Sequence, residues 1–266
     1  MSLSMKATSK GQGTYLYCVA DSGEVVNLGG IGLEHCEVYT IVYRDICAVV
    51  HSCNAEPYLS SNDETLKTWI IAHQTVIDTA WKRWGNVLPS GFDTIIKGEA
   101  ERGSDENVRL WLEEEYNRLK SCLEKLRGKA EYGVQIFWDS KAIAREIAET
   151  SEEILKIEAE IRAKPKGLAY MHRQKLELLL RKELEARAEL CFKEYYDRIT
   201  KHVDDARVEK TKKAEHGTQM LMNLSCLASE DDCTELGKEL ERINALEAFS
   251  VRFTGPWPPY SFVGRA

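Results

Sequence analysis

The chain has 266 residues, with 36 lysines and arginines against 43 aspartates and glutamates, so its formal net charge is −7. This acidic balance argues against a protein that binds nucleic acid through phosphate contacts, because such proteins usually show a basic excess. A content of 43% hydrophobic residues excludes collagen-like and disordered chains. The length predicts one large or two ordinary domains with hydrophobic cores.

Several sequence signals bear on the cellular compartment. The first residues are small and polar and contain no apolar run typical of a secretory signal peptide. There is also no stretch of 18 apolar residues that would span a bilayer. The eight cysteines form no Cys-x-x-Cys pair and no Cys/His pattern with zinc spacing. We therefore expect a cytoplasmic protein with reduced thiols, no bound metal and no membrane contact.

Residues 14–128 are predicted to form an N-terminal α/β domain, after a disordered tail over residues 1–13. Its strands are expected at 15–20, 38–43 and 46–53, with a tight turn at Arg44-Asp45. A further extended segment is expected at 87–96. Pro89 in that segment suits the edge of a sheet, because proline cannot donate a hydrogen bond to a neighbouring strand.

Two helices complete this domain. Ser61 is predicted to cap the first helix, and an apolar stripe at helical spacing then runs through His73 until Gly85 ends the helix. A second helix is expected to begin near Ser104 and to continue to Leu126. The sequence therefore predicts a sheet covered by two helices in the first half of the chain.

Residues 129–254 are predicted to form a C-terminal α/β domain with a helical insertion. Apolar residues follow heptad spacing from Ile143 to Ile161 and again from Leu176 to Ile199, with a Lys-Pro-Lys-Gly break between the two runs. This pattern favours an antiparallel helical hairpin at about 141–200, and one long kinked helix is the alternative. The remaining elements are expected to be strands at 134–138, 220–227 and 249–253 and a helix that begins after Ser229.

The C-terminal residues 255–266 form a tail rich in proline and aromatic residues. Three prolines within four positions favour the polyproline II conformation and exclude a helix or a central strand. Aromatic rings are costly to leave in water, so the tail is expected to pack. It either joins the two α/β domains within the chain or offers a preformed apolar patch to a partner.

A search for catalytic motifs is mostly negative, because the Walker A, GxGxxG, GxSxG and HExxH patterns are absent. His51 and Cys53 lie two residues apart on a predicted strand, so they share one face and could form a Cys–His nucleophile. His73 is more typical of a hydrogen-bonded core or interface histidine than of a catalytic one. We therefore expect no enzyme and no cofactor.

The C-terminal run from Arg252 to Phe262 resembles the signature of the gas vesicle protein F/L family. Further segments agree with this family in order and spacing: Tyr15-Leu16-Tyr17, Ala72-His73 leading to Val87-Leu88-Pro89, Glu131-Tyr132-Gly133-Val134, and residues 167–170. Two departures stand out. The family tends to continue after Leu-Pro with an arginine and Phe-Gly-Thr, where this chain has Ser90-Gly91-Phe92-Asp93-Thr94, and a common lysine is replaced by Gln135.

The resemblance implies a cytoplasmic accessory or minor structural protein of gas vesicles, with no catalytic activity and no cofactor. It implies two modified ferredoxin-like domains, the second with a helical portion. It also implies contact with the small apolar shell subunit, with other gas vesicle accessory proteins as further partners, and a place on the gas-facing side of the shell.

We expect a strand of the shell subunit to add to the sheet edge of the N-terminal domain, around Pro89 to Ile95. The candidate residues for partner interaction or domain packing are His73, Pro89, Phe92, Thr94, Gly255, Pro256, Trp257, Pro258, Pro259, Tyr260 and Phe262. Two other hypotheses remain. One is an unrecognised enzyme that uses Cys53 with His51, or His73, and the other is a coiled-coil scaffold in which the hairpin dimerises.

Overall fold

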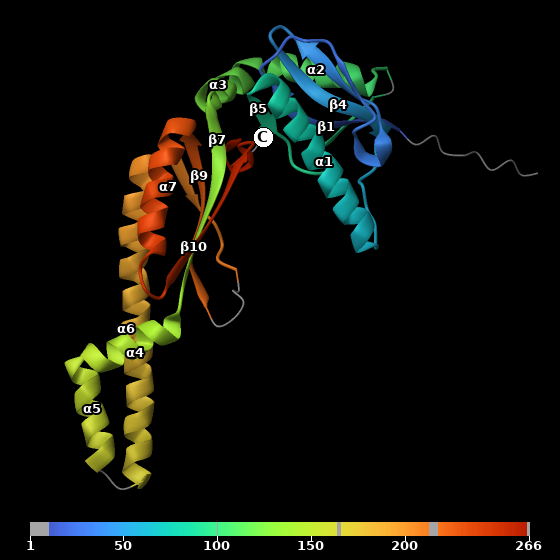
Figure 1. Ribbon diagram of the computed structural model, residues 1–266. Coiled ribbons are helices and arrows are strands. Elements are labelled where there is room, and N and C mark those ends of the chain that lie inside the picture. Colours follow the sequence, from blue (N-terminus) through green and yellow to red (C-terminus); the bar gives the residue numbers. More distant parts are fainter. Residues whose placement is uncertain (1–10, 100, 164–165, 213–217, 265–266) are drawn as a thin grey trace, which may run out of the picture. The chain divides into compact units, whose positions relative to one another are not determined.

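The structure is a computed structural model that describes residues 11–99, 101–163, 166–212 and 218–264 (Figure 1). It divides into two compact units: unit 1 comprises Met1–Glu131 and Pro256–Ala266, and unit 2 comprises Tyr132–Gly255. Both units contain helices and strands, which confirms the expected mixed α/β class. Of the tail predicted to be disordered over residues 1–13, residues 1–10 lie outside the described residues, and the prediction is wrong for Gln12 and Gly13, which belong to the first strand. Lys164-Pro165 of the predicted hairpin break also lies outside the described residues.

Unit 1 is built on an antiparallel sheet. Among the described residues its strands are β1 (Gln12–Ala20), β2 (Asn27–Gly29), β3 (Val38–Tyr43), β4 (Ile46–Asn54), β5 (Val87–Pro89) and β6 (Ile95–Lys97). The order is β2-β3-β4-β1, and β5 and β6 both pair with β1. The predicted turn between β3 and β4 is confirmed, with Arg44 at a positive φ of 55°. The strand β2 was not predicted, because three residues are too few to show a period.

A β-bulge in β1 interrupts the alternation of its side chains between the two faces of this sheet. The pairing with β4 shifts by one residue between Leu16 and Cys18, so Tyr17 is the extra residue. Tyr17 and Cys18 therefore both pack in the core that α1 (Asp63–Trp84) covers, whereas Leu16 and Val19 face the opposite side. Without the bulge, strict alternation would place Leu16 and Cys18 on the same face.

The helices of unit 1 correct two predictions. The N-cap of α1 is Asn62 and not Ser61, because the Asn62 side chain accepts a hydrogen bond from the Glu64 backbone N–H. The predicted second helix is divided into α2 (Ser104–Glu114) and α3 (Tyr116–Leu126) by the non-helical backbone of Glu115. Apolar spacing did not show this break, because Leu112 and Leu119 lie seven residues apart and would share a face of one continuous helix as well. Gly85 ends α1 at a φ of 72°, as predicted.

The cap of α1 gives a direct test of this correction. We expect Asn62→Ala to lower the free energy of unfolding by about 1 kcal/mol, because the Glu64 backbone N–H loses its acceptor. Ser61→Ala is the matched control and should change the free energy by less than half of that, since its side chain is not the cap. Urea unfolding followed by circular dichroism measures both variants. A larger loss for Ser61→Ala would contradict the cap in the structure.

Unit 2 is built on a four-stranded sheet within the described residues. Its strands are β7 (Lys129–Trp138), β8 (Asp205–Val208), β9 (Gln219–Ser229) and β10 (Phe249–Trp257), in the order β10-β7-β9-β8. The helix α7 (Glu230–Asn244) follows β9, and the predicted cap Ser229 accepts a hydrogen bond from the Asp232 backbone N–H. The strand β8 was not predicted, since it is short, mostly exposed and half charged. β10 continues into the tail as an edge strand as far as Trp257, so the polyproline expectation is wrong for Gly255, Pro256 and Trp257. The expectation that the tail forms no helix is also wrong, because the short helix η3 (Tyr260–Phe262) follows, whereas the described residues of the tail form no central strand.

The insertion in unit 2 is a helical hairpin. Its first arm is broken at Ser151 into α4 (Ser140–Thr150) and α5 (Glu152–Ala163), and both helices contact α6 (Lys166–Ile199). Figure 1 shows α5 running alongside the first part of α6. Ile143, Ile147 and Ile154 of the first seam pack in one cluster with leucines of α6, which include Leu176, Leu180 and Leu184. The hairpin prediction is therefore favoured over a single kinked helix. Among the described helices, none is long and apolar enough to cross a membrane.

Candidate functional site: an apolar groove in unit 1

An apolar groove of about 390 Å³ lies on the face of the unit 1 sheet opposite α1. Its floor comes from β1, β5 and β6, one wall comes from α2 and α3, and the C-terminal segment forms another side. The apolar side chains of the lining are Leu16, Val19, Leu88, Pro89, Ile96, Trp111, Leu119, Tyr260 and Val263, and the charged Arg118 also lines the groove. A concave site with this mostly apolar lining is typical of a binding site for apolar groups.

The C-terminal segment is fixed to unit 1 by a buried carboxylate. The backbone N–H of Ser261 donates to Glu131 Oε2 at 2.7 Å, and its hydroxyl donates to Oε1 at 2.6 Å. Phe262 is buried beside this contact, and the short helix η3 (Tyr260–Phe262) forms there. The Glu131 motif and the C-terminal signature, which the sequence shows as separate segments, thus meet in the same contact. The role of the tail in joining the two units remains a prediction.

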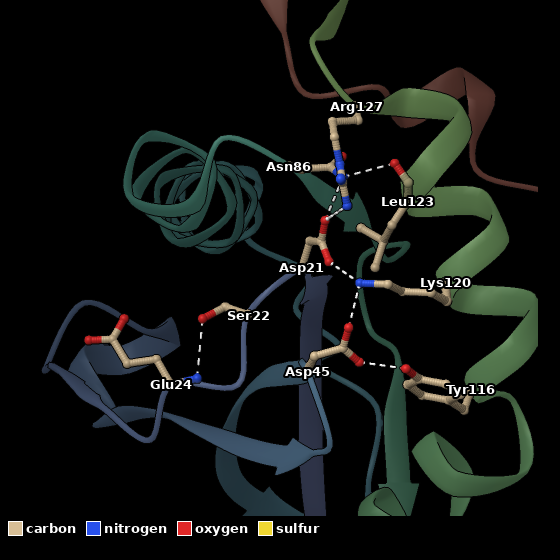
Figure 2. Close-up of polar contacts among 9 residues, drawn as sticks. All are labelled: Asp21, Ser22, Glu24, Asp45, Asn86, Tyr116, Lys120, Leu123 and Arg127. Carbon is tan, nitrogen blue, oxygen red and sulfur yellow. Dashed lines mark hydrogen bonds and ion pairs between the residues drawn. The ribbon is translucent and has the colours of Figure 1, made fainter.

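A polar network holds α3 against the sheet and so shapes the wall of the groove. Figure 2 shows Asp21, after β1, accepting hydrogen bonds from Lys120 and Arg127, both at 2.6 Å. Lys120 also contacts Asp45 in the turn between β3 and β4, at 2.7 Å. Tyr116 donates to the same Asp45 carboxylate at 2.5 Å. One lysine on α3 therefore joins two loops of the sheet.

The charges in this network stabilise one another. Burial opposes ionisation of Asp21, but the hydrogen bonds from Lys120 and Arg127 outweigh it and keep the pKa of Asp21 below its ordinary value. Hydrogen bonds from Lys120 and Tyr116 lower the pKa of Asp45 to about 2. The hydrogen bond to Asp21, followed by that to Asp45, raises the pKa of Lys120. At neutral pH all three groups are charged, so the network is an ion-paired contact and has no free base.

On the α1 side of the sheet, His51 belongs to a buried chain of hydrogen bonds. Tyr17 Oη lies 2.8 Å from His51 Nδ1 and accepts from the Leu33 backbone N–H at 2.9 Å. His51 Nε2 lies 3.0 Å from Tyr58 Oη. Because the Leu33 N–H already donates to the Tyr17 oxygen, the Tyr17 hydroxyl donates its own proton to His51 Nδ1. We therefore assign the His51 tautomer in which Nε2 carries the proton and donates to Tyr58 Oη.

His73 has a matching arrangement. Tyr15 Oη lies 2.9 Å from His73 Nδ1, and His73 Nε2 lies 3.2 Å from the Ser90 carbonyl oxygen. Because a carbonyl can only accept, Nε2 carries the proton and Tyr15 donates to Nδ1. Burial lowers the pKa of both His51 and His73 to about 4. Both rings are therefore neutral and hydrogen-bonded in the core.

The arrangement does not favour a Cys–His nucleophile. Both ring nitrogens of His51 are engaged by tyrosines. Burial raises the pKa of the Cys53 thiol to about 11, so this thiol is protonated at neutral pH. Among the described residues, no group of three or more His, Cys, Asp or Glu side chains is placed to hold a metal ion.

The predicted residues fall into three environments. Pro89, Thr94 and Tyr260 line the groove. His73, Phe92 and Phe262 pack in the interior of unit 1. Gly255, Pro256 and Trp257 lie in β10, with Trp257 half exposed and Gly255 at a φ of 121° that favours glycine, and Pro258 and Pro259 are buried just before η3.

The expected sheet edge from Pro89 to Ile95 is not a continuous strand. Pro89 ends β5 and Ile95 begins β6, and the residues between them form a turn in which Asp93 has a φ of 67°. Sequence reasoning missed Trp111, Leu119 and Val263 as groove residues. The first two belong to the predicted apolar stripe of a helix, and no signal marked Val263.

Comparisons with known proteins identify the family. The model of the family described as gas vesicle synthesis protein GvpL/GvpF matches residues 13–264. The chain belongs to this family. The match covers both units and confirms the resemblance seen in the sequence. The members of this family are gas vesicle proteins and are not a known class of enzymes. Membership of the family indicates that this chain has a role in gas vesicle formation.

Individual relatives agree with this assignment. Gas vesicle protein L1 of Halobacterium salinarum is 32% identical over 259 residues, which cover 94% of this chain and 90% of the relative. Gas vesicle protein F of a Nostoc species is 24% identical over 258 residues, which cover 94% of this chain and 97% of the relative. The crystal structure of GvpF from Anabaena matches this chain with a TM-score of 0.76 at 21% identity, over 96% of this chain and 99% of that one. At this identity the likeness is one of fold.

Proposed function

We propose that this chain supports gas vesicle formation by binding the apolar shell subunit at the groove of unit 1. The observation that carries the proposal is the apolar lining of that groove, to which the C-terminal signature contributes Tyr260 and the residue just after the signature, Val263, also contributes. A shell that excludes liquid water needs an apolar inner surface, and its unassembled subunit would associate through that surface. Covering part of it would keep the subunit available for assembly.

The groove is favoured over strand addition as the mode of binding. The segment from Pro89 to Ile95 is interrupted by a turn, and Val87 and Pro89 are buried, so this side of the sheet offers little free backbone. A groove accepts apolar side chains from one face of a helix or from an extended segment. We also propose that the two units are modified ferredoxin-like domains. The two arms of the hairpin pack on each other and do not serve to dimerise the protein. The protein is associated with the vesicle, on the gas-facing side of the shell.

A matched pair of valine variants tests the groove. We expect Val263→Glu to weaken capture of the shell subunit by the full-length chain about tenfold or more, because a carboxylate in the apolar groove loses its hydration. Val25→Glu is the control: this valine is 82% exposed and lies outside the groove, so capture should be unchanged. Co-purification with tagged shell subunit, at equal protein concentration, measures both.

Equal capture by Val263→Glu and the parent chain would show that the groove is not the binding site. The circular dichroism spectrum of each variant separates a binding defect from misfolding.

The proposed location on the gas-facing side has its own test. We expect the protein to stay with purified vesicles after their outer surface is stripped. Loss on stripping would place it on the water-facing side.

A further inference from the structure

A second cavity in unit 1 combines carboxylates with aromatic rings. It has a volume of about 170 Å³ and lies where the chain leaves β4 and approaches the first turns of α1. Its lining includes Glu34, Glu56, Pro57, Tyr58, Leu59 and Trp69, and it shares none of its residues with the groove. We propose that this cavity binds the side chain of a lysine or arginine presented by a protein partner.

The aromatic part of the cavity is held in place by the core. The rings of Tyr58 and Trp69 lie 5.3 Å apart at an angle of 79°, so they form two sides of a corner. Tyr58 is anchored at both ends, since its backbone N–H donates to Asp93 Oδ1 at 2.9 Å and its hydroxyl contacts His51 Nε2 at 3.0 Å. A cation placed against such rings is attracted by their negative faces, and tryptophan is the strongest of the aromatic residues in this respect.

The described residues that line the cavity carry charge of one sign. Glu34 and Glu56 are exposed carboxylates at its rim, and the structure describes no basic residue in its lining. Burial raises the pKa of Tyr58, with a smaller electrostatic contribution from Glu34, so the Tyr58 hydroxyl stays protonated and Glu34 lies close enough to affect it. The site therefore offers negative charge above neutral aromatic walls.

The shape of the lining favours a long basic side chain over a bare cation. Leu59 is 82% exposed and lies beside Pro57 and Trp69, so an aliphatic stem can pack along apolar groups while its charged end reaches the carboxylates. A metal ion would need more ligands than these two carboxylates, and among the described residues no larger ligand group is present here. A protein partner supplies such a stem through lysine or arginine. This inference is independent of shell subunit binding at the groove.

The test uses the full-length chain and two small probes. One probe is the tripeptide acetyl-Gly-Arg-Gly-amide, and the other carries citrulline, which has nearly the same shape without the charge. We expect the arginine peptide to shift the Trp69 indole N–H signal in nuclear magnetic resonance spectra, with saturation in the millimolar range. The citrulline peptide should bind about tenfold more weakly or not at all.

Variants assign the shift to the cavity. Glu56→Gln and Glu34→Gln replace exposed carboxylates without loss of volume, and together they should weaken the arginine peptide about tenfold. Trp69→Leu should abolish binding, followed on backbone amide signals, whereas Trp257→Leu removes a half-exposed tryptophan elsewhere and should leave binding unchanged. Equal binding of both peptides, no saturable shift in that range, or full binding by the double glutamine variant would each overturn the proposal.

Discussion

Lowering the pH from about 6.5 to about 4 is expected to reduce the free energy of unfolding by about 3 kcal/mol for each of His51 and His73. Both rings are buried and neutral, and burial lowers the pKa of each from 6.5 to about 4. In the unfolded chain they take up protons below pH 6.5, whereas in the folded chain they do so only near pH 4. Their stabilising effect is therefore complete above pH 6.5 and is lost as the pH falls through this window.

Urea unfolding at several pH values between 7 and 4 measures this loss. The carboxylates of the chain also titrate at the acidic end, so the histidine contribution is isolated with His51→Gln and His73→Gln. Glutamine keeps a polar amide near the tyrosine partners but does not titrate. We expect the stability of each variant to fall less steeply between pH 6.5 and 5 than that of the parent chain. Parallel curves for all three proteins would show that the histidines are not buried and neutral.

Tyr17→Phe is expected to lower the free energy of unfolding by about 2–4 kcal/mol. The ring and its packing remain, but the hydroxyl serves two buried partners, the Leu33 backbone N–H at 2.9 Å and His51 Nδ1 at 2.8 Å. Each partner loses its hydrogen bond in a region that water does not reach, because Tyr17, Leu33 and His51 are all fully buried. Denaturant unfolding at pH 7.5, where both histidines are neutral, measures the loss.

Tyr43→Phe is the matched control for this variant. Its hydroxyl donates at 3.2 Å to the exposed Glu113 carboxylate, which water can solvate after the change. We expect a loss of less than about 0.5 kcal/mol. If both tyrosine variants lose the same stability, the buried hydrogen bonds of Tyr17 contribute nothing beyond those at the surface.

The fold was predictable where a residue period extends over enough positions. β1, β3 and β4 are apolar runs, α1 has a helical stripe, and the two heptad seams predicted the hairpin. The sequence did not show the bulge at Tyr17 or the break at Glu115. Both preserve the apolar pattern and change only where side chains point, which depends on packing against distant elements.

The candidate site was predictable only in part for the same reason. Pro89 and Tyr260 were marked by their residue types and by the resemblance. Trp111, Leu119 and Val263 join them because α2, α3 and the C-terminal segment converge on one face of the sheet. The hydrogen bonds between Glu131 and Ser261 join residues 130 positions apart, and no local pattern encodes such a pair.

The division of unit 1 into two stretches of sequence has a consequence for its synthesis. Met1–Glu131 leaves the ribosome long before Pro256–Ala266, and the whole of unit 2 is translated in between. Until then the nascent protein exposes the apolar surface that Tyr260, Phe262 and Val263 later cover. The Glu131 carboxylate also lacks its hydrogen bonds from Ser261 during this time. Chains released before Pro256–Ala266 is made would be prone to aggregate, and chaperones would be needed most until that segment has emerged.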